Sequence, residues 1–146
     1  MSTFLLTRWG RATVGDIPFI GLCPGAALVV WHRLGALPID HALAGVIPRN
    51  PLVRLRIPQD VLIRSVGRAT DLVLRKGLPK PARCTVLAAT RVSLLRATGV
   101  RAQYASGAWN SEDGLRFHAW VELGGQRLYE PGDALYRTLF RFPVMP

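Results

Sequence analysis

Apolar residues recur at helical spacing in two neighbouring segments in the middle of the chain. The first runs from Pro58 to Lys76, with Asp60 near its start and Gly77 after its last basic residues, an order typical of a helix. The second runs from Ala82 to Ala97 and is followed by Gly99, which commonly ends a helix. The pattern therefore predicts two long helices, each with one buried face.

After Gly99 the apolar residues alternate with polar ones, which is the spacing of β-strands. Strands are predicted over residues 100–107, 115–123 and 126–130, and residues 134–142 as a further strand or an extended tail. Turn-forming residues separate these segments at 110–114, 124–125 and 131–133. Helices followed by a small antiparallel sheet predict an α+β fold.

The first 57 residues give a weaker pattern. Residues 1–16 are amphipathic, residues 25–35 are predicted to be helical, and a short helix is expected from Pro38 to Gly45. Prolines interrupt residues 47–57, which we interpret as an extended linker and the best candidate boundary. Residues 1–57 are therefore predicted to form an N-terminal helical cap, which either packs on the core or docks a partner. Residues 58–146 form the predicted core, and the two parts are expected to make one compact unit.

The segment from Ile17 to Trp31 is rich in apolar residues, but prolines and glycines interrupt it at Pro18, Gly21, Pro24 and Gly25. We expect it to be too short and too broken to span a membrane. The order of charged, apolar and small residues of a secretory signal is also missing. The segment is therefore predicted to be a buried or partner-facing helix.

Composition narrows the choice of partners. The 146 residues suffice for one domain with a hydrophobic core, and 19 basic against 9 acidic residues give a net charge of +10, which favours an anionic partner. The basic residues are dispersed and no nucleic-acid-binding motif is present, so a nucleic-acid partner is not expected.

The two cysteines, Cys23 and Cys84, form no metal cluster with the three histidines, so we expect no metal site. Two cysteines are also too few for a disulfide scaffold, so we expect a cytoplasmic location.

Candidate chemistry centres on Cys84 and His118. Cys84 is predicted in the first turn of the second long helix, where free backbone N–H groups and the helix dipole favour a thiolate and could also bind an oxyanion. His118 lies in mid-strand beside Trp120, where its neighbours would hold it in place as a base must be held. A lone cysteine near a helix start is more often a small buried residue. The order helix cysteine, strand histidine and then an acid is, however, that of papain-like enzymes.

Two acids compete for the third role, Glu130 and Asp133. If the glycine pair 124–125 is a strict two-residue loop, Glu130 pairs with Ala119 and points away from His118, which favours Asp133. A longer loop or a bulge would place Glu130 opposite Trp120 and diagonal to His118. Spacing alone leaves both open.

Three aromatic residues are candidates for the substrate cleft, namely Trp120, Trp109 and Tyr104, although Trp109 and Tyr104 would serve equally well as core residues. Glu122 shares the face of His118 but lies too far along the strand to orient it. We expect Glu122 to be solvated, with Arg127 as its candidate partner.

The sequence resembles the transglutaminase-like cysteine peptidases of lasso-peptide biosynthesis, which correspond to the C-terminal part of the fused maturation B protein. The resemblance lies in Cys84, in Phe117-His118-Ala119-Trp120-Val121-Glu122 and in the acid twelve residues beyond His118, and residues 80–125 carry most of it. It implies a papain-like or transglutaminase-like core with Cys84 as nucleophile and His118 as base and then acid. The usual aspartate of that family falls on Glu130, with Asp133 as the runner-up.

The resemblance also implies a reaction and partners. Such enzymes remove the leader from a ribosomally made precursor peptide without a cofactor. A separate small recognition protein presents the leader, and an ATP-dependent cyclase then closes the ring. Two alternatives remain from the residues: another acyl transfer on the same scaffold, as in a transglutaminase or amidase, and a non-catalytic basic binding module.

Overall fold

The computed structural model of the chain describes residues 14–130 and 136–145. Its helices precede its strands, so the predicted α+β class is confirmed. The elements are a 3-10 turn (Val14–Asp16), α1 (Ile17–Ala36), α2 (Ile39–Val46), α3 (Gln59–Leu74), α4 (Lys80–Ala97), β1 (Gln103–Ser111), β2 (Gly114–Leu123), β3 (Gln126–Leu128) and β4 (Arg137–Phe142).

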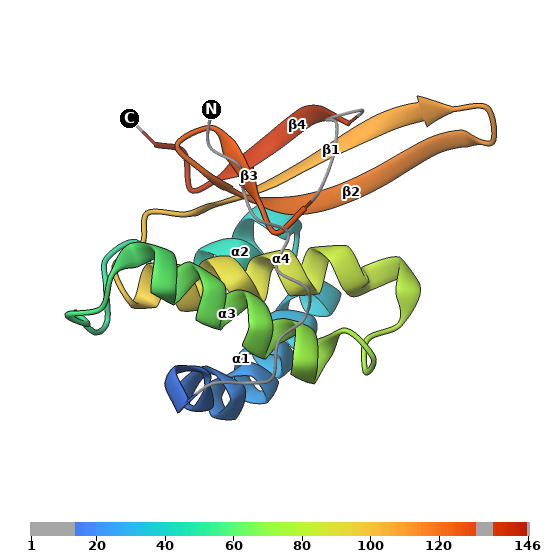
Figure 1. The fold of residues 1–146 in the computed structure, drawn as a ribbon. Helices are drawn as coiled ribbons and strands as arrows, with labels where there is room; N and C mark the ends of the chain where they lie inside the picture. Colours follow the sequence, from blue (N-terminus) through green and yellow to red (C-terminus); the bar gives the residue numbers. More distant parts are fainter. Residues whose placement is uncertain (1–13, 131–135, 146) are drawn as a thin grey trace.

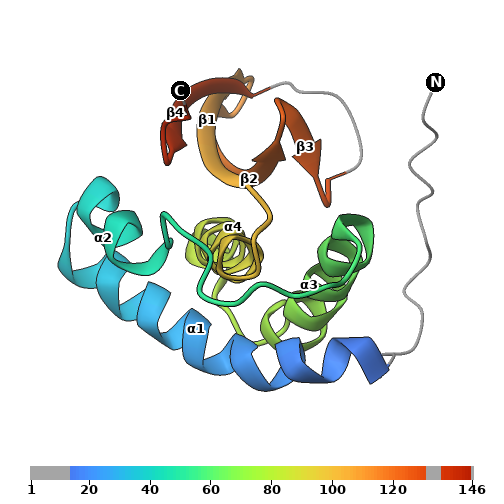
Figure 2. The ribbon, with the colours of Figure 1, turned by 90° about the vertical axis from the view of Figure 1, so that its left-hand side faces the viewer.

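Helix α4 lies at the centre of the molecule. The sheet covers one side of it, α1 crosses the opposite side, and α2 and α3 flank it (Figures 1 and 2). A helix enclosed in this way needs apolar residues on more than one face, and Val86, Ala89, Val92 and Leu95 are all buried. The central position of α4 matters because this helix carries Cys84.

The sheet is antiparallel, with strand order β3-β2-β1-β4. Gly124 and Gly125 both have positive φ and form a strict two-residue loop, since Leu123 pairs with Gln126. Strand β1 begins three residues later than predicted and ends at Ser111, four residues beyond its predicted end and two residues into the predicted turn. The tight turn at 124–125 and the strand order fix which side chains share the face of His118.

The prediction that prolines and glycines break the first apolar segment is wrong. Helix α1 is continuous over 20 residues, and Pro18 falls in its first turn, where no backbone hydrogen bond is lost. Its buried stripe packs against α3 and α4, and this tertiary packing overrides the weak propensity around Pro24. Within the described residues, α1 is the one helix whose length and apolar composition would also suit a membrane crossing. Core helices of soluble proteins and signal sequences meet the same criterion.

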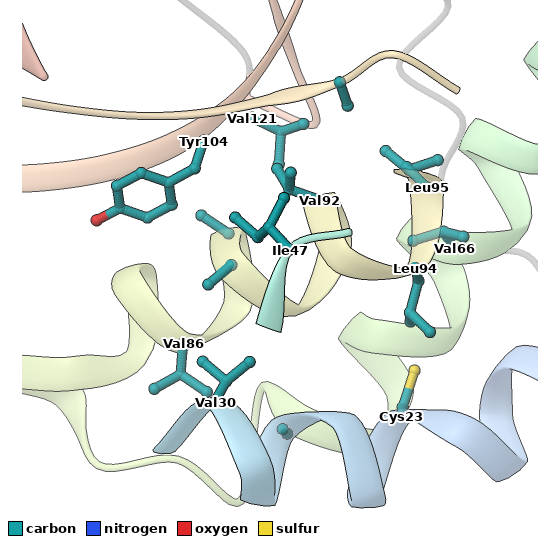
Figure 3. Packing of buried hydrophobic residues seen from close by; sticks show 14 of the residues in the cluster. Cys23, Val30, Ile47, Val66, Val86, Val92, Leu94, Leu95, Tyr104 and Val121 are labelled. Atoms are coloured by element: carbon teal, nitrogen blue, oxygen red, sulfur yellow. The ribbon is translucent and has the colours of Figure 1, made fainter. Parts of the chain in front are cut away.

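One hydrophobic core joins the predicted cap to the predicted core domain. Cys23 and Val30 of α1 lie in the same cluster as Val66 of α3, Val92 of α4 and Val121 of β2 (Figure 3). The segment between α2 and α3 is fixed to the end of α4, because the backbone N–H groups of residues 52 and 53 both donate to the carbonyl of Ala97. The division at residue 57 and the docking role of residues 1–57 stay predictions.

Candidate active site

Cys84 faces the sheet from the second turn of α4. The helix begins at Lys80, two residues earlier than predicted, so the expectation of a first-turn cysteine is wrong. Burial of the thiol alone would raise its pKa. Hydrogen bonds from His118, from the backbone N–H of Ala119 and from Thr85 outweigh burial, so the pKa of Cys84 is lowered from its usual value. The contacts across to β2, rather than the helix terminus, therefore favour the thiolate.

His118 lies between Cys84 and Glu130. Its Nε2 is 2.5 Å from Oε1 of Glu130, and the two side chains are 26% and 28% exposed. The hydrogen bonds with Cys84 and then with Glu130 raise the pKa of His118 to about 9, against the opposing effect of burial. At neutral pH the arrangement therefore favours a thiolate beside an imidazolium.

The strict two-residue loop is present, but its expected consequence, that Glu130 points away from His118, is wrong. The two-residue loop does pair β2 with β3 so that position 130 would continue opposite Ala119. Strand β3 ends at Leu128, however, and Tyr129 adopts a positive φ of 67°. This left-handed residue breaks the alternation, and Glu130 then reaches His118. The competing acid, Asp133, lies outside the described residues.

Trp120 supports His118 from within the sheet. Its ring is 1% exposed and stacks on the imidazole at 6.2 Å between centroids, and Tyr136 contacts the imidazole at 5.1 Å. The guanidinium of Arg127 lies 3.8 Å from the centre of the Trp120 ring. Trp120 borders the cleft as predicted, but so little of it is exposed that it positions His118 more than it offers a surface to substrate.

The expectation that Glu122 is solvated and pairs with Arg127 is wrong. Glu122 is 3% exposed, accepts a hydrogen bond from Nε1 of Trp120 at 2.8 Å and pairs with Nε of Arg141 at 2.7 Å. Arg141 reaches it from β4, across the small side chain of Ala105 on β1. Because β4 returns beside β1, a carboxylate that looked exposed in one hairpin becomes buried and paired.

The other two cleft candidates lie elsewhere. Tyr104 is buried in the core and contacts Phe140 edge to face, and Trp109 is half-buried with its ring against Tyr136. Neither is among the residues that line the cleft, so their assignment to it is wrong. Trp109 is linked to His118 through Tyr136, whose ring contacts both side chains.

The cleft has a volume of about 600 Å³ and opens between the end of α3, the start of α4 and strands β2 and β3. Cys84, His118 and Glu130 all line it. Phe117, which is 69% exposed, lines the sheet side, and residues 75, 80 and 83 give the helix side three basic groups. A substrate carbonyl can therefore approach the thiol from solvent. Among the described residues, no cluster of histidine, cysteine and acidic side chains could hold a metal ion.

The sequence argument missed several residues of the site. Tyr136 follows the last turn with no periodic pattern, Arg141 comes from a strand that was only an alternative to a tail, and Tyr129 contributes through its backbone. Of these residues, only Arg141 could have been found from the sequence, because the alternation over residues 137–142 predicts the strand that carries it.

A thiol on a central helix, an imidazole on the facing strand and a carboxylate just beyond the next strand form the arrangement of cysteine-dependent hydrolases and acyltransferases. Comparison with protein families agrees. The family model of the transglutaminase-like superfamily matches residues 27–141, and the chain belongs to this superfamily. The superfamily includes cysteine peptidases and acyl transferases. No curated protein and no solved structure gave a significant match.

Proposed function

We propose that this protein is a cysteine peptidase that removes the leader from a ribosomally synthesised lasso-peptide precursor. The observation that carries the proposal is the contact of His118 with both Cys84 and Glu130 inside one open cleft. The resemblance of residues 80–125 to the leader peptidases supports the choice of substrate, and the superfamily supports the choice of chemistry.

The proposed reaction starts from the thiolate of Cys84 and the imidazolium of His118. The sulfur attacks the carbonyl carbon at the junction between leader and core, and His118 gives its proton to the departing core amine as the C–N bond breaks. Water then attacks the thioester, with His118 as base, and releases the leader as a free acid. Glu130 holds the imidazole in orientation and stabilises its charged form, which is the role of the acid in such triads. The reaction uses no metal and no cofactor.

The proposal includes partners and a location. A separate small recognition protein binds the leader and brings it to this cleft, and an ATP-dependent cyclase receives the released core. Residues 1–57 supply the surface for the recognition protein, where α1 leaves Ile17, Leu28 and Val29 exposed. All of these proteins act in the cytoplasm.

The test is mass spectrometry of a lasso precursor incubated with this protein and a candidate leader-recognition protein. We expect free leader acid and core peptide, and loss of both products in the Cys84→Ala variant with the fold retained. Cys23→Ala is the matched control, because Cys23 is fully buried in the core and burial raises its pKa to about 11. Full activity in Cys84→Ala would exclude this mechanism.

Two further measurements separate the alternatives. An added amine that ends as a leader amide, in place of leader acid, would favour a transglutaminase or amidase. Slow alkylation of Cys84 near neutral pH would favour a non-catalytic binding module, because a structural thiol in an apolar site is inert.

A further inference from the structure

We propose that Tyr129 is the residue that positions Glu130 against His118, by anchoring the end of β3 to helix α3. The proposal rests on the proposed function, because positioning matters only if Glu130 serves His118. It assigns a role to a residue that touches neither the thiol nor the imidazole.

The backbone of Tyr129 is the first observation. Among the described residues, Tyr129 is the only one other than glycine with a positive φ. A bulky side chain rarely adopts this conformation, so its surroundings must hold it there. Without this turn, continuation of the β2–β3 pairing would put Tyr129 on the face of His118 and Glu130 on the opposite face.

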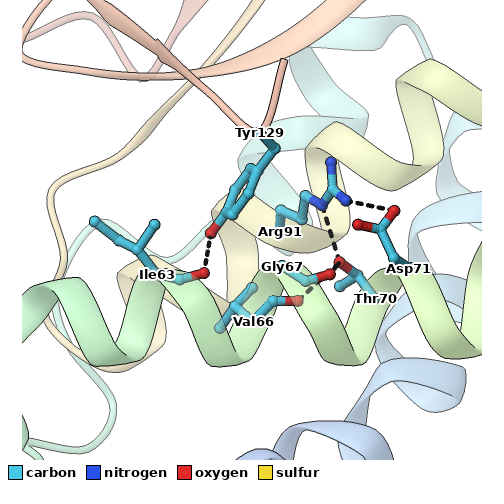
Figure 4. Close-up of polar contacts among 7 residues, drawn as sticks. All are labelled: Ile63, Val66, Gly67, Thr70, Asp71, Arg91 and Tyr129. Carbon is cyan, nitrogen blue, oxygen red and sulfur yellow. Dashed lines mark hydrogen bonds and ion pairs between the residues drawn. The ribbon is translucent and has the colours of Figure 1, made fainter. Parts of the chain in front are cut away.

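The side chain of Tyr129 packs on α3 at two points. Its hydroxyl donates to the carbonyl of Ile63 at 2.7 Å (Figure 4). Its ring lies against Gly67, where a Cβ atom would come within 2.6 Å of the ring, so glycine leaves the space that the ring fills. A hydroxyl contact and a fitted ring together fix both ends of the side chain.

The third contact comes from α4. The guanidinium of Arg91 lies 4.4 Å from the centre of the Tyr129 ring, and it is itself held by Asp71 at 2.8 Å and by the hydroxyl of Thr70 at 2.9 Å (Figure 4). Tyr129 therefore links α3, α4 and the sheet at one point. In the part of the chain that the structure describes, the side chain of Glu130 makes its hydrogen bond with His118. Tyr129, as the adjacent anchored residue, therefore helps to fix the backbone from which Glu130 reaches His118.

The titratable and charged groups that line the cleft come from both layers. They are Asp71 on α3 and Arg75 just after it, Lys80, Arg83, Cys84 and Arg91 on α4, His118 on β2 and Glu130 just after β3. Only Cys84 and Glu130 act on the pKa of His118, apart from burial. Loss of the Glu130 contact should therefore lower the pKa of His118 and, through it, destabilise the thiolate of Cys84. The pH at which Cys84 becomes reactive is thus a measure of where Glu130 lies.

The experiment follows iodoacetamide alkylation of Cys84 against pH, with the modified peptide identified by mass spectrometry. Glu130→Gln removes the contact directly and is the reference variant. We expect it to raise the pH midpoint of Cys84 alkylation by about one unit. At a pH well below the wild-type midpoint, a rise of one unit should slow alkylation by about threefold, because the rarer thiolate is also more nucleophilic. Tyr129→Ala should give the same rise, and Tyr129→Phe, which keeps the ring but loses the hydroxyl contact, a smaller one.

Two variants separate positioning from general stability. Val30→Ala truncates a buried residue of α1 that does not line the cleft, so it should lower the melting temperature and leave the alkylation midpoint unchanged. Tyr129→Asn tolerates the left-handed backbone but lacks the ring, and it replaces Tyr129→Ala if that variant does not fold.

The outcomes distinguish this inference from the proposed function. A wild-type midpoint in both Tyr129→Ala and Tyr129→Asn, with a raised midpoint in Glu130→Gln, would overturn the positioning role and leave the peptidase proposal intact. A wild-type midpoint in Glu130→Gln would overturn both the role of Glu130 and that of Tyr129. Raised midpoints in the Glu130 and Tyr129 variants, with Val30→Ala unchanged, would support the inference.

Discussion

The proposed leader removal should occur within a pH window that two groups of the cleft define. The lower limit is the ionisation of Cys84, whose pKa is lowered, and the upper limit is that of His118, whose pKa is raised to about 9. The first step needs the thiolate and the protonated imidazole together. The value of kcat/KM should therefore follow the population of that pair, as expected for two coupled groups.

The position of the upper pH limit follows from the shift in the pKa of His118. A change in pKa from 6.5 to about 9 favours the imidazolium by about 3 kcal/mol. At pH 8 a free histidine is roughly 3% protonated, whereas His118 should be about nine-tenths protonated. Activity should therefore stay high through pH 8 and fall about tenfold for each pH unit above the upper limit.

The Glu130→Gln variant tests whether the contact with Glu130 is what raises the pKa of His118. It removes the charged partner at 2.5 Å, so the upper limit should move towards neutral pH by about one unit or more. The assay is the initial rate of precursor cleavage from pH 5 to 10.5 at constant ionic strength and with substrate well below KM. Circular dichroism at each pH controls for unfolding. An upper limit that is the same in wild type and Glu130→Gln would refute the reasoning.

Two changes within the sheet should have measurable effects. Arg141→Met should lower the free energy of unfolding by about 1–2 kcal/mol, because Glu122 keeps a buried charge without its cation, while water still reaches the half-exposed Arg141 site. Urea unfolding should give a smaller loss in a Glu122→Gln background, and equal losses would contradict the buried pair. Gly107→Ala should cost about 2–3 kcal/mol and slow cleavage, because the added methyl group would meet the Trp120 ring and the backbone of β4. Gly35→Ala, with open space around it, is the control and should be neutral or stabilising.

Local rules of the sequence suffice for the two long helices and the central hairpin. Helices α3 and α4 begin and end within two residues of their predicted limits, because proline, glycine and charge mark those ends. The glycine pair at 124–125 likewise fixes its loop. The proximity of Cys84 and His118 was predictable for a similar reason, since helix and strand assignments already place a thiol and an imidazole on two elements that can face each other.

The remaining features depend on contacts between elements that are distant in sequence. Helix α1 forms through Pro24 because its stripe is buried against α3 and α4, and no local signal describes that burial. Glu122 is buried because Arg141 arrives from a strand two places away in the sheet. Tyr129 takes a left-handed conformation because α3 offers a glycine-lined site to its ring. In each case tertiary packing decides against the local preference.

These distant contacts also explain why His118 is held so firmly. Trp120 and Tyr136 contact its ring, and Cys84 and Glu130 hydrogen-bond to it. These four residues lie in different segments: Trp120 on β2 beside His118, Tyr136 just before β4, Cys84 on α4 and Glu130 just after β3. A triad held from only one side would let the imidazole rotate and lose contact with the thiol. Because the supports come from separate elements, a change at any one of them should alter the pH dependence of catalysis before it unfolds the protein. Residues far from the thiol therefore belong in a mutational study of this site.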